Sequence, residues 1–112
     1  MVLDEFYNQV IGQRDRFFLE ARIDILELLP NEYLKLRVRI SEEFFISIRF
    51  NVRNNRQDLA LINEGRRIFG YDNLKSWHCH PLTDPTKHVP CRKPSIVKVF
   101  REMSEIVKQL EK

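Results

Sequence analysis

A chain of 112 residues with 43% apolar and 31% charged side chains can fold as one globular domain but is too short for two separate cores. No run of about 18 apolar residues is present, which excludes a transmembrane helix. The N-terminal segment places acids early and lacks the basic-then-apolar order of a signal peptide, and the net charge of +3 is modest. We therefore expect a single cytoplasmic domain over residues 1–112 that does not enter a membrane.

The first expected element is a short helix over residues 3–12. Its apolar side chains recur every three or four positions, which places them on one face of a helix, and Gly12 is the expected end. A helix this short must pack against the rest of the fold to be stable. The apolar side chains belong to Leu3, Phe6, Tyr7, Val10 and Ile11.

Apolar and polar residues then alternate in five stretches, and this period of two predicts about five antiparallel β-strands in a meander. The alternation breaks at Leu26–Leu29, which predicts a β-bulge or a strand end. Asn63, Glu64 and Gly65 predict a hairpin turn in which Gly65 has positive φ. The five stretches cover residues 17–29, 33–41, 44–53, 58–63 and 66–71.

One face of the expected sheet is apolar and the other is rich in basic side chains. The basic face is either a solvated surface, with Glu20 and Asp24 as counter-charges, or a surface that binds RNA or an acidic partner. Its basic residues are Arg22, Lys35, Arg37, Arg39, Arg49 and Arg53.

The C-terminal part of the chain divides into a loop and a helix. Residues 72–94 show no usable period and contain four prolines, which predicts a long irregular segment of the kind that often carries function. Residues 95–111 are amphipathic, with Ser95 as the expected N-cap, so this helix is expected to cover the apolar face of the sheet. The fold class is therefore α+β.

The segment from Arg66 to Cys91 concentrates the reactive side chains of the chain. It holds all three histidines and both cysteines, and residues 65–101 contain eight basic residues against two acidic ones. A local excess of positive charge attracts phosphate groups and favours encounters with nucleic acid, although it is also compatible with a solvated basic loop. The histidines are His78, His80 and His88, and the cysteines are Cys79 and Cys91.

One interpretation of this segment is acid–base catalysis on an RNA backbone without a metal. Cleavage needs a base for the 2′-hydroxyl, an acid for the leaving 5′-oxygen and cations beside the phosphate. Histidine suits both proton transfers near neutral pH, and an acidic residue such as Asp72 orients an imidazole. The candidate catalytic residues are Asp72, His78, His80 and His88. The candidate RNA-binding residues are Arg66, Arg67, Tyr71, Lys75, Trp77, Lys87 and Arg92.

Two other interpretations stay open. His78, His80, His88 and Cys91 are side-chain types that zinc accepts, and two cysteines twelve positions apart indicate free thiols or ligands rather than a disulfide framework. Their spacing matches no strong zinc signature, so no metal and no cofactor is the primary expectation. The third interpretation is structural, because histidines in a proline-rich loop often cap strands or bond to the backbone.

The order of these motifs resembles the TumE-like toxins of bacterial and archaeal toxin–antitoxin modules. The likeness extends over about residues 18–110, and it differs from the family pattern at Gly70, where the family has arginine, and at Cys79, which separates the histidine pair. The matching residues are Glu64–Gly65, Ile68, Phe69, Tyr71, Asp72, Asn73, His78, His80 and Lys87–His88.

The resemblance implies a toxin that blocks translation by acting on RNA and a cognate antitoxin protein that neutralises it. We therefore expect a toxin-like protein that acts as a hydrolase of RNA. The expected activity is that of a metal-independent endoribonuclease. The sequence leaves open whether the protein forms a homodimer. The alternatives are a non-catalytic module that binds nucleic acid or protein through its basic surface, and a small zinc-binding protein.

Overall fold

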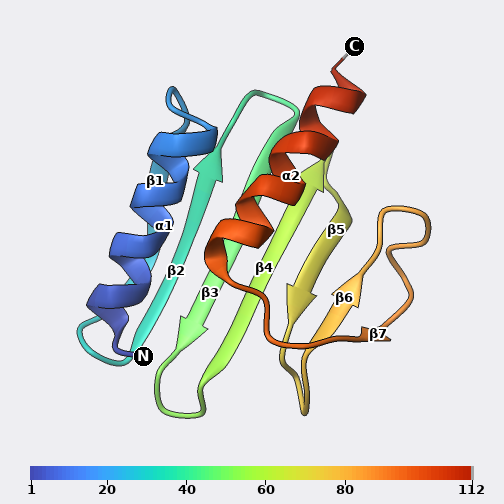
Figure 1. Cartoon of the computed structure of the whole chain (residues 1–112). Helices are drawn as coiled ribbons and strands as arrows, with labels where there is room; N and C mark the ends of the chain where they lie inside the picture. The colour runs from blue at the N-terminus through green and yellow to red at the C-terminus, as the bar shows by residue number, and fades with distance from the viewer. Residues whose placement is uncertain (112) are drawn as a thin grey trace.

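Two helices cover one face of a seven-stranded antiparallel sheet in the computed structural model, which describes residues 1–111 (Figure 1). The strands follow one another across the sheet in chain order, so the α+β meander is confirmed, with two more strands than expected. No helix within residues 1–111 is both long and apolar enough to cross a membrane. The elements are α1 (Leu3–Phe17), β1 (Arg22–Leu29), β2 (Tyr33–Arg39), β3 (Phe44–Asn51), β4 (Arg56–Asn63), β5 (Arg66–Asp72), β6 (His78–His80), β7 (Val89–Pro90) and α2 (Ile96–Leu110).

Helix α1 is longer than the sequence pattern suggested. It continues through Gly12 to Phe17, so the expected stop at Gly12 is wrong, and β1 begins at Arg22 instead of residue 17. A glycine inside a helix costs only about 1 kcal/mol, which the packing of neighbouring turns offsets. The guanidinium of Arg14 donates to the Ala21 carbonyl at 2.8 Å and holds the helix end against the start of the strand.

The two additional strands lie in the segment that was expected to be irregular. Strand β6 pairs with β5 and the two-residue strand β7 pairs with β6, so the sheet continues into residues 72–94. Strands of three and two residues are too short to show a period of two. Pro90 is tolerated because β7 is the edge strand, where no further strand requires its missing N–H.

Two local predictions about the sheet are confirmed. The register of β1 against β2 shifts between Ile25 and Glu27, which places a bulge at Leu26. In the β4–β5 turn, Glu64 and Gly65 have φ of 51° and 79°, so both adopt the positive values that a tight hairpin requires.

The hydrophobic core lies between the helices and the sheet. Helix α1 covers the β1–β2 side and α2 crosses the centre of the sheet, as Figure 1 shows. Ser95 caps α2 as expected, because its Oγ accepts from the Lys98 backbone N–H at 3.1 Å. The fully buried core side chains include Phe6, Val10, Leu36, Val38, Ile46, Ile48, Phe50, Leu61, Val99, Phe100 and Met103.

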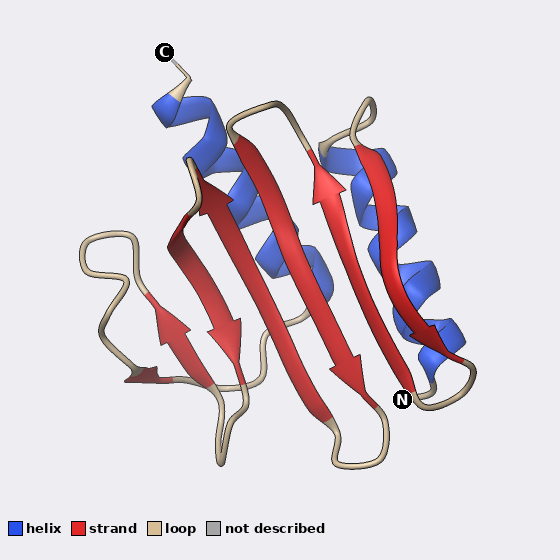
Figure 2. Ribbon diagram, turned by 180° about the vertical axis from the view of Figure 1, so that it is seen from behind, coloured by secondary structure: helices blue, strands red, loops and turns tan. Residues whose placement is uncertain are grey.

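The opposite face of the sheet carries no helix (Figure 2). We call this the open face. Alternation along β2, β3 and β4 sends Lys35, Arg37 and Arg49 to this face while their neighbours enter the core. Arg53 was expected here too, but it lies in the turn after β3 and belongs to no strand.

Candidate active site

The three histidines meet at the β5–β6 end of the open face. Strand register places His78 opposite Asp72 and His80 opposite Gly70, so both imidazoles project from the open face. His88 returns to them from the loop that follows β6. The ring centroids of His80 and His88 are 4.5 Å apart, and those of His78 and His88 are 5.8 Å apart.

His80 is held by both of its ring nitrogens. Its Nε2 lies 2.6 Å from Oδ2 of Asp72, and its Nδ1 lies 3.2 Å from the carbonyl oxygen of Pro85. A carboxylate and a carbonyl oxygen are both acceptors, so both bonds form only when each nitrogen carries a proton, which is the imidazolium form. The side chain of His80 is 1% exposed. His80 is therefore a buried imidazole with both nitrogens facing protein acceptors, and it has no free nitrogen to offer a substrate.

Asp72 is the anionic member of this pair. Burial alone would raise the pKa of its carboxyl group, but the hydrogen bonds from His80 and from the Leu74 backbone N–H outweigh it and lower the pKa below the ordinary value. Each carboxylate oxygen has its own partner: Oδ1 accepts from the Leu74 backbone N–H at 3.1 Å, and Oδ2 faces His80. Asp72 therefore fixes the position of β6 and the ring orientation of His80.

The residues on either side of Asp72, Tyr71 and Asn73, also hold β5 in place. Tyr71 points into the core, where its hydroxyl donates to Glu102 Oε1 of α2 at 2.7 Å. The Asn73 side chain accepts from the Gln57 backbone N–H at 2.7 Å and donates to the Asn55 carbonyl at 2.7 Å. The three consecutive motif residues thus tie β5 to α2, to β6 and to the β3–β4 turn.

His78 and His88 are the two accessible imidazoles. His88 is exposed and His78 is half-buried, and the buried Nδ1 of His78 has no hydrogen-bond partner within residues 1–111. Both rings line an open cleft of about 470 Å³ on the open face. We call this the histidine cleft. Its lining residues are Arg49, Arg56, Asp58, Arg67, Asp72, Leu74, Lys75, His78 and His88.

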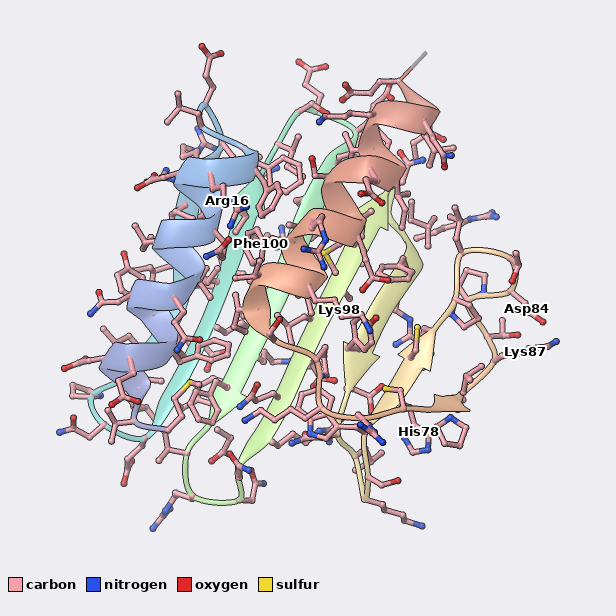
Figure 3. All side chains as sticks on the ribbon, viewed as in Figure 1. Arg16, His78, Asp84, Lys87, Lys98 and Phe100 are labelled. Carbon is pink, nitrogen blue, oxygen red and sulfur yellow. The ribbon has the colours of Figure 1, made fainter. Side chains whose placement is uncertain are left out.

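The predicted RNA-binding residues separate into two groups. Arg67 and Lys75 line the histidine cleft, whereas Arg66, Lys87 and Arg92 are exposed outside it. In Figure 3, Lys87 extends from the outer loop, away from His78. The two aromatic candidates require correction, since Tyr71 is buried in the core and Trp77 packs against it, so the structure brings neither to the cleft.

Three further residues line the cleft that sequence reasoning did not place there. They come from β3 and β4. Arg49 pairs with Asp58, Asp58 with Asp72, and Asp72 with His78, so these residues form one row across the sheet that ends at the histidines. A correct prediction of the register of the hairpins would have placed them beside the histidines. The residues are Arg49, Arg56 and Asp58.

The arrangement offers a partial set of metal ligands. One ligand atom from each of Asp72, His80 and His88 lies within 4.8 Å of the others. The separation of 2.6 Å between Asp72 and His80 is that of a charge-assisted hydrogen bond, which a metal shared by both would have to break. Cys91, the expected fourth ligand, instead packs against the hydrophobic core. The four residues proposed as a zinc site therefore do not converge.

Comparisons of the chain with protein-family models, with curated proteins and with solved structures give no match.

Proposed function

We propose that the protein is a metal-independent endoribonuclease in which His78 and His88 share the proton transfers. The observation that supports this most is the pair of accessible imidazoles with ring centroids 5.8 Å apart in a cleft lined by basic side chains. A phosphodiester lying against both rings would have one imidazole near its 2′-hydroxyl and the other near its 5′-oxygen.

The chemistry follows from the two rings. The neutral imidazole takes the proton of the 2′-hydroxyl, and the 2′-oxygen attacks phosphorus. The bond from phosphorus to the 5′-oxygen breaks as the protonated imidazole gives that oxygen its proton. The products are a 2′,3′-cyclic phosphate and a free 5′-hydroxyl, and the proton accepted by one ring balances the proton lost by the other.

Cations in the cleft complete the proposed mechanism. Negative charge on the phosphate oxygens grows in the transition state, and fixed positive groups stabilise it. Arg67 and Lys75 line the cleft, and no carboxylate among residues 1–111 forms an ion pair with either. Asp72 and His80 hold the surrounding backbone and do not exchange protons with the substrate.

The proposed biological role is that of a toxin in a toxin–antitoxin module, acting on RNA in the cytoplasm and neutralised by an antitoxin protein. It rests on the resemblance of the segment around Tyr71–Asn73 and the histidines to TumE-like toxins. In this role, expression of the protein arrests growth, and His88→Ala relieves the arrest.

The decisive experiment is cleavage of labelled single-stranded RNA by purified protein in the presence of EDTA. Wild type is expected to produce fragments with 2′,3′-cyclic phosphate ends, and His78→Ala and His88→Ala to lower the rate about a hundredfold. Loss of wild-type activity in EDTA would favour the ligand group of Asp72, His80 and His88 as a metal centre instead. Equal rates in wild type and both variants would refute the histidine mechanism.

A further inference from the structure

We propose that the open face of the sheet is a binding site for single-stranded RNA that leads the strand across β2, β3 and β4 into the histidine cleft. This inference rests on the proposed function for the direction of the strand, and it adds a substrate class and a second set of binding residues. The supporting observations are a trough in the sheet surface, a guanidinium stacked on an aromatic ring, and a shared residue that joins the trough to the cleft.

The trough follows from which residues are paired across the strands. Ser47 of β3 pairs with Ala60 of β4, and Ala60 pairs with Gly70 of β5, so three small residues form one row across the sheet. Larger side chains stand in the rows on either side, including Arg49 on one side and Phe45 on the other. A row of small residues between rows of large ones leaves a depression that crosses the strands.

An open hollow of about 460 Å³ begins at the Ser47 end of this row and extends over β2, β3 and the end of β4. We call it the sheet trough. Four of its lining side chains are basic or aromatic, which are the types that contact phosphates and bases. The lining residues are Lys35, Arg37, Phe45, Ser47, Arg49, Ile62 and Gly65.

Arg37 and Phe45 form a stacking platform within the trough. The guanidinium carbon of Arg37 lies 4.5 Å from the centroid of the Phe45 ring, and that of Arg39 lies 5.9 Å from the same ring. The Nε of Arg37 is buried and has no hydrogen-bond partner within residues 1–111, so stacking holds this guanidinium without an ion pair. Unpaired bases stack on aromatic rings and on guanidinium planes, which duplex RNA cannot do because its bases are already stacked.

Arg49 joins the trough to the histidine cleft. Its side chain lines both hollows, and it also lines a smaller one of about 160 Å³ with Tyr33 and Arg56. The distance from β2 to β6 corresponds to four strand spacings, or roughly 19 Å. A short single strand lying across the sheet would therefore contact the trough and present one phosphodiester to His78 and His88.

The charges on the trough favour a polyanion. Asp24 is paired with Arg22 and Arg39, and Asp58 lies near Arg49 and Arg56, so these carboxylates neutralise part of the face. Lys35 and Arg37 have no carboxylate partner among residues 1–111. Nucleic acid fits better than an acidic protein, because the aromatic platform accepts bases and the trough leads to the imidazoles.

The experiment measures binding separately from cleavage. Binding is followed by fluorescence anisotropy with a single-stranded 2′-O-methyl RNA of about 12 nucleotides, which lacks the reactive hydroxyl and matches known single-strand site sizes. The variants are Arg37→Ala, Phe45→Ala and Lys35→Ala, and Arg101→Ala on the exposed surface of α2 is the charge-matched control. Thermal unfolding of each variant verifies that it is folded, and cleavage of a dinucleoside phosphate reports on the histidine cleft alone.

We expect Phe45→Ala to weaken binding about tenfold or more through lost stacking. Arg37→Ala and Lys35→Ala should each reduce the slope of log affinity against log salt by about 0.7, the value for one phosphate contact on a single strand. Arg101→Ala should bind like wild type, and a duplex of the same sequence should compete poorly. All three trough variants should cleave the dinucleoside phosphate at the wild-type rate.

The two proposals can fail independently. If wild type cleaves the dinucleoside phosphate but the trough variants bind RNA normally, the trough inference is refuted and the histidine mechanism stands. If wild type cleaves nothing while Phe45→Ala and Arg37→Ala weaken RNA binding, the trough stands as a binding site and the nuclease proposal falls. Binding of polyglutamate in preference to the RNA would show an acidic-protein surface and refute the inference.

Discussion

The Oδ2 atom of Asp72 and the Nε2 atom of His80 lie 2.6 Å apart, and this bond fastens the last long strand of the sheet to the short strand that carries two of the three histidines. The bond separates the histidines into different roles. His80 is committed to Asp72 and to the Pro85 carbonyl, whereas His78 and His88 face the cleft. The proposed RNA cleavage and the stability of the fold should therefore depend on different imidazoles.

Substitution of His80 and of His88 should have opposite effects. His80→Ala leaves the Asp72 carboxylate without its hydrogen-bond partner and should lower the free energy of unfolding by roughly 1.5–3 kcal/mol. His88→Ala removes an exposed ring, so unfolding should change by less than about 0.5 kcal/mol while RNA cleavage falls about a hundredfold. Urea denaturation and cleavage assays on both variants test this. A destabilised His88→Ala protein with normal activity would contradict the assignment.

The Asp72 carboxylate should make the free energy of unfolding depend on pH in the acidic range. Its pKa in the folded protein is lowered by His80 and by the Leu74 N–H, so the stabilisation is complete above its unfolded value of about 3.9 and is lost as pH falls through the folded value. Asp72→Asn should therefore be less stable than wild type at pH 7, and the difference should shrink below about pH 4. Denaturant midpoints from pH 7 to pH 2.5 measure it. A difference that is constant over this range would argue against the ion pair.

Gly70 should not tolerate a side chain. A Cβ added there would lie 2.7 Å from the carbonyl oxygen of Leu59 and 3.1 Å from Cα of Ala60, both in the backbone of β4. Gly70→Ala should therefore destabilise the protein by about 1–3 kcal/mol, and Gly70→Arg, the residue of the TumE-like pattern, by at least as much.

The matched control for Gly70 is Gly12 in α1, where nothing lies within 4 Å of an added Cβ. Gly12→Ala should raise stability by about 0.5–1 kcal/mol, because alanine is the better helix former. Thermal unfolding of the variants compares the two positions. Equal destabilisation at both would show that the close approach at Gly70 is not the cause.

The hydroxyl of Tyr71 links α2 to the sheet, and its contribution to stability should be lost at high pH. Burial, followed by the bond to the Glu102 carboxylate, raises the pKa of Tyr71 far above its ordinary value. The stabilisation is therefore complete below the unfolded value of about 10 and is lost as pH rises through the folded value. Tyr71→Phe should cost roughly 1 kcal/mol at pH 7 and show a flatter loss of stability above pH 10. Tyr33→Phe, on the open face, is the control.

The fold could be predicted from the sequence wherever a pattern ran long enough. The alternation through Leu34–Ile40 and the apolar stripe of 95–111 identified strands and a helix, and the Glu64–Gly65 turn set the register between β4 and β5. Gly12 misled because helix-breaking tendency is a small energy that tertiary packing overrides. Strands β6 and β7 were missed because they are too short to show a period.

The site was harder to predict because it depends on distant pairings. The sequence identified the histidines and Asp72 as a group, but it could not show that His80 is buried between two acceptors. Tyr71 was assigned to RNA because aromatic residues stack on bases, yet alternation along β5 turns it toward α2 while Asp72 faces the opposite side. Arg49 entered the cleft through the register of three hairpins, which residue spacing alone does not reveal.

The order of the strands also bears on how the protein forms. Because every strand pairs with its neighbour in the chain, each hairpin can close as soon as its second half leaves the ribosome, and such local closure favours rapid folding. The imidazoles belong to the end of this series, and α2, which seals the opposite side, is made later still. We therefore expect nascent chains to hold an ordered N-terminal sheet well before they hold an assembled histidine cleft.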